Sequence, residues 1–169
     1  MFHLLKVFLD ICLLRAPPQT IPKSTLLQAL TLLTYVVANG FLAAEELPGW
    51  KAVLAAGVDA LLLVALAQTV LWVRNTPERV TQTVTALAGT GTLLTLIAMP
   101  VLAALQHGDQ ANVIQALAWI ALVFWSIIVV GHIIRHAMSV HFLWGMAISA
   151  GYWYISYNVM YILFLQNNA

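Results

Sequence analysis

Residues 117–134 of this 169-residue chain read LAWIALVFWSIIVVGHII. A helix built from them is apolar on nearly every side, whereas a helix of a soluble bundle carries a polar face at helical spacing. A hydrocarbon layer about 30 Å thick is crossed by roughly 20 helical residues. The stretch therefore predicts a helix that spans a membrane.

Apolar stretches of this kind fill almost the whole chain. Of all residues, 62% are hydrophobic and 8% are charged, whereas about a quarter of the residues of a soluble domain are charged. The pattern predicts five transmembrane helices, at about 24–44, 52–73, 81–105, 112–134 and 142–165. The expected fold class is all-α, a polytopic membrane helical bundle that occupies residues 24–169.

Residues 1–23 are expected to form a separate N-terminal segment. An amphipathic helix comes first, with polar side chains on one face: His3, Lys6 and Asp10. Such a helix is typical of one that lies along the membrane surface, and a short helix packed against the spans is the alternative. Pro17, Pro18 and Pro22 then predict an extended connector.

Lysine and arginine are distributed unevenly between alternate connections. With a cytoplasmic N-terminus, six of the seven basic residues fall on the cytoplasmic side: Lys6, Arg15, Lys23, Arg74, Arg79 and Arg135. Lys51 falls on the other side. Because basic residues are enriched in cytoplasmic loops, the N-terminus is expected in the cytoplasm and the C-terminus in the periplasm or outside the cell. The net charge of +1 gives no basic field for nucleic acid.

Small residues at four-residue spacing indicate where helices pack closely. Ala52, Ala56 and Ala60 form one such stripe, and the last stretch carries two more, Gly145 with Ser149 and Ala147 with Gly151. The stretch 81–105 is rich in threonine and glycine, which also favours an inward position. The stretch 112–134 is instead expected to face lipid or a partner.

Asp59 is the first candidate functional residue, because it is a carboxylate well inside the second stretch. Such residues usually face a bundle interior or a water-filled path. One interpretation is a titratable site for a proton or cation, and the other is a hydrogen-bonded group that joins two helices. Asn158 is expected at a similar depth, so an Asp59–Asn158 hydrogen bond is a specific hypothesis.

Tyr154 and Tyr157 are the second candidates, because their hydroxyls lie mid-span in the last stretch and need partners there. They could line a pocket for a quinone, a lipid head group or a subunit. Ordinary bundle packing and interfacial anchoring are the alternative.

His132, His136 and His141 are the third candidates. His132 and His136 share a helix face at i and i+4, a spacing that can hold a metal ion or flank a haem. A bis-histidine haem needs opposed ligands, and no acidic residue lies nearby in sequence to orient these rings. Interfacial histidines at a helix end are therefore favoured, and no metal site is predicted.

Residues 13–22, LLRAPPQTIP, followed by five spans, are similar to the leader of small proteobacterial inner-membrane proteins. The layout also distantly resembles that of Yip1-type five-span proteins, although the acidic and Tyr/Gly-rich motifs of the eukaryotic members are missing. The resemblance implies a bacterial inner-membrane protein and carries no site residue.

Three function classes follow from these features. The short connections and small-residue faces favour a non-catalytic accessory, assembly or structural subunit, with a membrane-protein partner or a second copy of the chain. A small transporter or channel component that uses Asp59 is the alternative. A redox subunit that holds haem or quinone is the second alternative. The chain carries none of the usual nucleotide-binding, zinc-protease or serine-hydrolase motifs, so a non-enzyme is favoured.

Overall fold

The computed structural model describes residues 2–107 and 113–166. Within these residues every regular element is helical, which confirms the all-α prediction. The long helices are α1 (Phe2–Cys12), α2 (Thr25–Ala43), α3 (Gly49–Val73), α4 (Val80–His107), α5 (Val113–Met138) and α6 (Phe142–Met160). Short turns precede α2 and α4, namely η1 (Pro18–Thr20) and η2 (Pro77–Arg79), and α6 continues as the π-helical η3 (Tyr161–Leu165).

Four helices of the described chain are long and apolar enough to cross a membrane: Thr25–Ala43, Gly49–Val73, Pro77–Ala104 and Val113–Met138. They correspond to the first four predicted stretches. The fifth stretch is helical as α6 and η3, but it is not among these four helices, because its serine, tyrosine and asparagine residues lower its mean hydropathy. The structure thus supports a membrane protein with several spans and confirms four of the five predicted membrane-length apolar helices.

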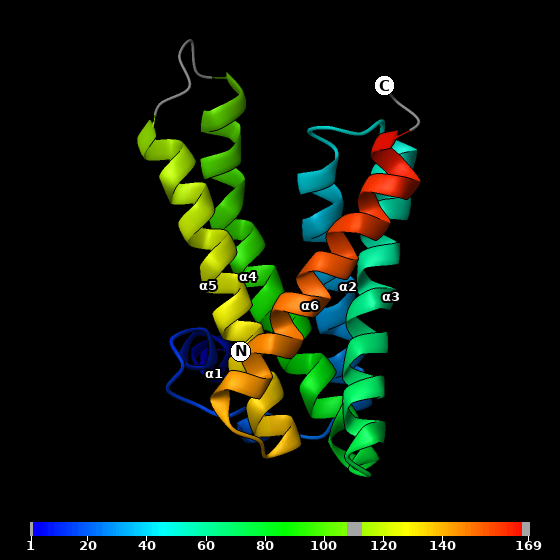
Figure 1. Ribbon diagram of the computed structural model, residues 1–169, viewed down its shortest axis with the longest axis vertical. Coiled ribbons are helices and arrows are strands. Elements are labelled where there is room, and N and C mark those ends of the chain that lie inside the picture. The colour runs from blue at the N-terminus through cyan, green and yellow to red at the C-terminus, as the bar shows by residue number, and fades with distance from the viewer. Residues whose placement is uncertain (1, 108–112, 167–169) are drawn as a thin grey trace.

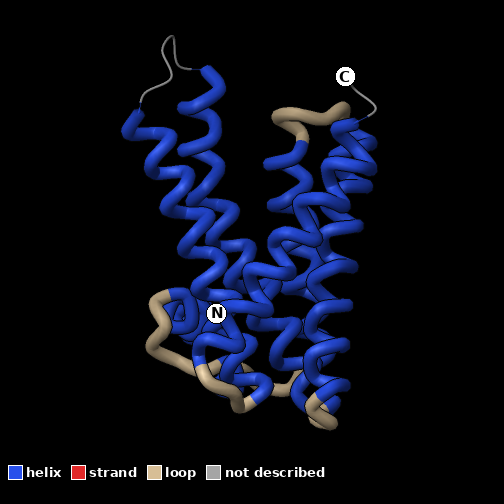
Figure 2. Tube along the Cα trace, viewed as in Figure 1, coloured by secondary structure: helices blue, strands red, loops and turns tan. Residues whose placement is uncertain are grey.

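The helices converge at one end and diverge at the other (Figure 1). At the converging end lie α1, the α3–α4 connection and the α5–α6 connection. At the other end, α4 and α5 separate from the group formed by α2, α3 and α6, as the Cα trace also shows (Figure 2). Pro100 lies inside the diverging half of α4 and removes one backbone donor there, which favours a bend away from its neighbours.

The core is built around the first half of α4, which packs against α2, α3 and α5. Residues 82–90 are buried without interruption. The threonine hydroxyls in this segment donate to carbonyls of their own helix, for example Thr85 Oγ1 to Thr81 O at 2.7 Å and Thr90 Oγ1 to Ala86 O at 2.7 Å. Because their polar atoms are satisfied locally, these small residues allow close packing without buried unpaired groups. The expected inward position of this stretch is confirmed.

The small-residue stripes behave differently from one another. Ala52, Ala56 and Ala60 are buried, as predicted. Gly145 and Ser149 are also buried, and Ser149 Oγ donates to the Ile127 carbonyl of α5 at 2.7 Å. The third predicted stripe is wrong, because Ala147 and Gly151 are exposed. Two residues correspond to about 200° of helix rotation, so a stripe displaced by two positions faces away from α5.

Helix α5 is exposed in its first half and buried in its second. Leu117 is 60% exposed and Phe124 is 62% exposed, whereas Val129 and Ile133 are fully buried. Its first half, which belongs to the diverging end, is thus exposed, and the expectation that lipid or a partner covers it stays a prediction. Its second half is part of the core.

Helix α1 has one packed face and one exposed apolar face. Phe8, Ile11 and Cys12 are buried, and the Phe8 ring lies against Gly89 of α4 so closely that a Cβ atom there would collide with it. The other face exposes leucines at four-residue spacing: Leu5, Leu9 and Leu13. One side of α1 thus packs against the bundle, as the alternative of a short packed helix predicts. The opposite side is exposed and apolar, as the prediction of a helix at the membrane surface requires.

Hydrogen bonds from long polar side chains join the segments at the converging end. Arg79 Nη1 donates to Ala137 O and to Ser139 Oγ, both at 3.1 Å. Gln82 Nε2 donates to Ile21 O at 2.5 Å and to Gln19 O at 3.2 Å. These bonds hold the proline-rich connector and the α5–α6 turn against the start of α4.

Candidate functional site

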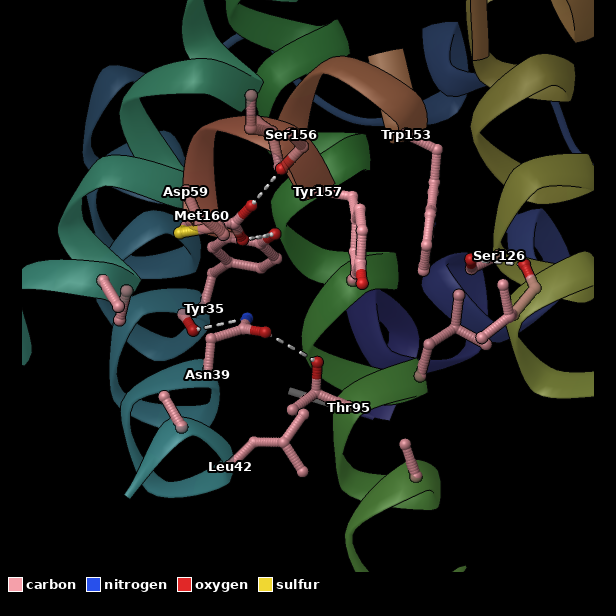
Figure 3. Close-up of a pocket in the computed structure, with 18 of the residues that line it drawn as sticks. Tyr35, Asn39, Leu42, Asp59, Thr95, Ser126, Trp153, Ser156, Tyr157 and Met160 are labelled. Carbon is pink, nitrogen blue, oxygen red and sulfur yellow. Dashed lines mark hydrogen bonds between the residues drawn. The ribbon is translucent and has the colours of Figure 1, made fainter. Parts of the chain in front are cut away.

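Asp59 lies at the meeting point of three helices (Figure 3). Tyr35 of α2 donates its hydroxyl to Asp59 Oδ2, and Ser156 of α6 donates its hydroxyl to Asp59 Oδ1 at 3.2 Å. Each carboxylate oxygen therefore has one hydroxyl donor from a different helix. This arrangement confirms that Asp59 faces the bundle interior, and it joins α2, α3 and α6 in the middle of the bundle.

Ser156, and not Asn158, is the residue of α6 that bonds Asp59. Asn158 Nδ2 donates to the Tyr154 carbonyl of its own helix at 2.7 Å. The hypothesis of an Asp59–Asn158 bond is therefore wrong. Depth along the helix was estimated correctly, but residues two positions apart point to nearly opposite sides of a helix.

Asn39 extends this polar cluster toward α4. Its Nδ2 donates to the Tyr35 carbonyl at 2.9 Å, and its Oδ1 accepts from Thr95 Oγ1 at 3.3 Å (Figure 3). Sequence reasoning missed both Tyr35 and Asn39. The sequence does contain a pattern that indicates them, because these two polar residues lie four positions apart on one face of the first span. Tyr35 is also about as many residues from the α2–α3 connection as Asp59 is, which places the two side chains at a similar depth.

A cavity of about 450 Å³ opens beside Asp59, between the two diverging groups of helices. Its volume falls within the range of about 300–1,000 Å³ that small-molecule sites occupy. Residues from α2 to α6 line it, and the lining extends from Asp59 to Glu46 in the α2–α3 connection. Most of the wall is aliphatic or aromatic, including Trp119 of α5 and Trp153 of α6.

The two candidate tyrosines are placed differently. Tyr157 lines the cavity with Tyr152, Trp153 and Ser156. Tyr154 is 71% exposed and does not contribute to the lining of this cavity. Tyr152 and Trp153 directly precede Tyr154, and the sequence does not specify which of these aromatic residues lie on the inward side of α6.

The cavity wall carries charge of one sign. Asp59 and Glu46 are acidic, and the described lining residues include no lysine, arginine or histidine. Placing a carboxylate in an apolar surrounding is costly unless it is hydrogen-bonded or paired with a cation. The hydroxyls of Tyr35 and Ser156 satisfy part of this requirement, and the cavity leaves room for a further group beside Asp59.

The three candidate histidines do not converge on one point. His132 is buried, with Nε2 at 3.1 Å from the Ala16 carbonyl, and its ring lies edge-on to that of His136 at 4.6 Å between centroids. Arg135 Nη2 lies 3.0 Å from His136 Nε2. His141 caps the start of α6 by accepting from Leu143 N at 3.4 Å.

Side chains suited to bind a metal ion are not grouped in the part of the chain that the structure describes. Across residues 2–107 and 113–166, no cluster of three histidine, cysteine, aspartate or glutamate side chains could hold one. The edge-on contact of His132 with His136 also differs from the opposed ligands of a bis-histidine haem.

Comparison with known proteins adds no family to these observations: no family model, curated protein or solved structure matches the chain. Function is therefore inferred from the geometry and chemistry of the Asp59 cavity.

Proposed function

We propose that this chain is a five-span bacterial inner-membrane protein whose Asp59 cavity binds a small molecule, and that it acts as a small transporter or a component of one. The observation that carries the proposal is a carboxylate exposed to a cavity of about 450 Å³ inside an otherwise apolar bundle. Ionisable residues within spans usually mark a ligand or ion path.

The fifth span is α6 in this proposal. Its 19 residues extend about 28 Å at roughly 1.5 Å per residue, and η3 lengthens it further. That length is close to the thickness of the hydrocarbon layer, about 30 Å. Bonds from Ser149 to α5 and from Ser156 to α3 compensate for its lower apolarity by satisfying its polar groups inside the bundle.

The converging end faces the cytoplasm in this proposal. Arg74, Arg79 and Arg135 lie at that end, and Lys51 follows the connection at the other end. Helix α1 then lies at the cytoplasmic interface, with Phe8 packed on the bundle and the leucines at 5, 9 and 13 in contact with lipid. The cavity then extends toward the opposite, periplasmic side, because its lining reaches Glu46 in the α2–α3 connection.

A C-terminal reporter fusion tests the span number and the orientation together. With five spans and a cytoplasmic N-terminus, alkaline phosphatase fused after residue 169 reaches the periplasm, where its disulfides form and it is active. Green fluorescent protein at the same position serves as the reciprocal control and stays dark. Active green fluorescent protein with inactive phosphatase would contradict the proposed combination of five spans and a cytoplasmic N-terminus.

A purely structural Asp59 is the competing explanation, since its two hydroxyl bonds tie three helices together. An enclosed carboxylate would suit that role best. Here the same side chain also lines the cavity, together with Tyr35, Tyr152 and Ser156. A ligand can therefore reach the carboxylate without breaking the helix contacts, which favours a binding role.

Ligand-induced thermal stabilisation tests the binding proposal. Purified protein in lipid nanodiscs is screened against amphiphiles of positive, negative and zero charge. A ligand that stabilises the wild type is expected to lose its effect in Asp59→Asn and in Val123→Trp, which fills the cavity from α5. Glu45→Gln is the matched control, because Glu45 is exposed and does not line the cavity.

The outcome that contradicts the proposal is clear. If no compound of any charge stabilises the wild type, or if every stabilising compound acts equally on Val123→Trp, the cavity is not a ligand site.

A second candidate function is that of an accessory or assembly subunit. Its support is the apolar surface of the first half of α5, including Leu117, Ile120 and Phe124, together with the unpacked small residues Ala147 and Gly151 of α6. Either surface could take a helix of a partner protein or of a second copy. Co-purification of a stoichiometric partner from native membranes would favour this function, and a monomer without partners would count against it.

A further inference from the structure

The Asp59 cavity combines acidic groups, aromatic rings and an apolar wall, and this combination selects a class of ligand. We propose that the ligand is a hydrophobic organic cation, such as a lipophilic amine or a quaternary ammonium or phosphonium ion. The inference rests on the proposed binding function and specifies its substrate class.

Charge is the first argument. The described lining residues contribute two carboxylates, Asp59 in the middle of α3 and Glu46 in the α2–α3 connection, and no basic group. A carboxylate in a medium of low dielectric constant attracts a cation far more strongly than it does in water, and it repels an anion equally. An anionic ligand would meet no basic group among the described lining residues, whereas a cation neutralises Asp59.

The hydrogen bonds of Asp59 leave it able to accept a further group. Tyr35 and Ser156 each donate one bond, to different oxygens. A carboxylate offers about four acceptor positions, so a ligand ammonium group can still bond to it, and a quaternary cation can lie against it without displacing either hydroxyl. The two hydroxyls also hold the carboxylate in a fixed position before the ligand arrives.

Aromatic side chains are the second argument. Tyr35, Trp119, Tyr152, Trp153 and Tyr157 all line the cavity. Trp153 and Tyr157 extend from α6 into the open space, Tyr157 on the side toward Asp59 and Trp153 on the side toward Ser126 (Figure 3). Aromatic faces attract cations, and each such contact raises affinity roughly twofold to thirtyfold, more when the site is dry.

The apolar wall favours an organic cation over a compact inorganic one. Metal ions such as Mg²⁺ and Ca²⁺ require six or more oxygen ligands, or water in their place. Near Asp59 the wall offers a few hydroxyls and the Asn39 amide, and most of the rest is formed by aliphatic residues such as Leu63, Leu87 and Val130. A cation whose charge is spread under hydrocarbon groups loses little hydration on entry and gains contact with this wall.

Tetraphenylphosphonium and tetraphenylborate test the inference, because they have the same shape and opposite charge. Full-length protein is placed in lipid nanodiscs, and binding of each radiolabelled ion is measured by equilibrium dialysis against empty nanodiscs. We expect saturable binding of one phosphonium ion per chain and at least about tenfold weaker binding of the borate. Val123→Trp is expected to abolish the saturable component.

Variants separate the contributions of charge and of the rings. Asp59→Asn is expected to weaken phosphonium binding about tenfold or more, and Glu45→Gln is expected to leave it unchanged. Tyr157→Leu removes an aromatic face without touching the Asp59 bonds, and a loss of about threefold or more is expected. This second variant decides the question if Asp59→Asn fails to fold, as its thermal midpoint will show.

Two results would overturn the inference. Borate binding as tightly as phosphonium, and blocked by Val123→Trp, would show a cavity that binds apolar molecules without regard to charge; the proposed function would then stand and the ligand class would fall. No saturable binding of phosphonium above empty nanodiscs would also overturn the ligand class, and the wider compound screen would decide the proposed function separately.

Discussion

Helices α5 and α6 approach each other closely at Gly131 and Gly145. A Cβ atom added at Gly145 would collide with the Gly131 carbonyl oxygen and lie 3.0 Å from Arg135 Cβ and 3.2 Å from Arg135 N. Two of these three neighbours are backbone atoms, which cannot move aside as the end of a flexible side chain can. Gly145→Ala must therefore push the two helices apart.

The size of this effect follows from the neighbouring contacts. Overpacking usually costs about 1–3 kcal/mol, and a backbone clash belongs at the upper end of that range. Separation of the helices also weakens the bond from Ser149 Oγ to Ile127 O, one turn away, which contributes roughly 0.5–1.5 kcal/mol. Replacing glycine by alanine within a helix also stabilises the helix by up to about 1 kcal/mol, which offsets part of this loss. We expect a net loss of roughly 2–4 kcal/mol in the free energy of unfolding.

Gly151→Ala is the matched control on the same helix. A Cβ atom there meets nothing within 4 Å, so only the gain in helix propensity remains. The thermal midpoints of both purified variants are measured in detergent, with size-exclusion chromatography used to monitor unfolding. The midpoint of Gly145→Ala is expected to fall by several degrees and that of Gly151→Ala to stay level or rise. Equal midpoints for the two variants would refute the packing assigned to α5 and α6.

Three further predictions concern α1 and its connector. Burial raises the pKa of the Cys12 thiol to about 11. Maleimide labelling of Cys12 should therefore be slow at pH 7 and should accelerate about tenfold per pH unit up to pH 10. As the control, the exposed position of Lys23 should label rapidly when Lys23→Cys is made in a Cys12→Ser background. Because the unfolded thiol ionises first, near its usual pKa of 9.0, the free energy of unfolding should also decrease as the pH rises from 9 to 11, and a flat profile would contradict this. Gln82→Leu leaves the Ile21 carbonyl without its donor and should lower the free energy of unfolding by about 1–3 kcal/mol, whereas Gln68→Leu on the exposed face of α3 should not lower it.

The sequence was sufficient for the features that depend on composition and on local chemistry. Long apolar stretches have to form helices in a membrane, because a backbone without water must bond to itself. Ser24 accepts from Leu27 N at the start of α2, and serine is among the residues that favour this capping position. The interior position of Asp59 was also predictable, since a carboxylate cannot face lipid cheaply.

The sequence alone did not determine how each helix is rotated and aligned against its neighbours. A helix that is apolar on all sides has no hydrophobic face to set its orientation, so close packing of particular side chains decides it. This explains why Ser156 rather than Asn158 bonds Asp59, why Tyr157 lines the cavity while Tyr154 points away, and why only one of the two stripes of α6 packs. The cavity itself results from the divergence of α4 and α5 from the other helices, which only the tertiary structure specifies.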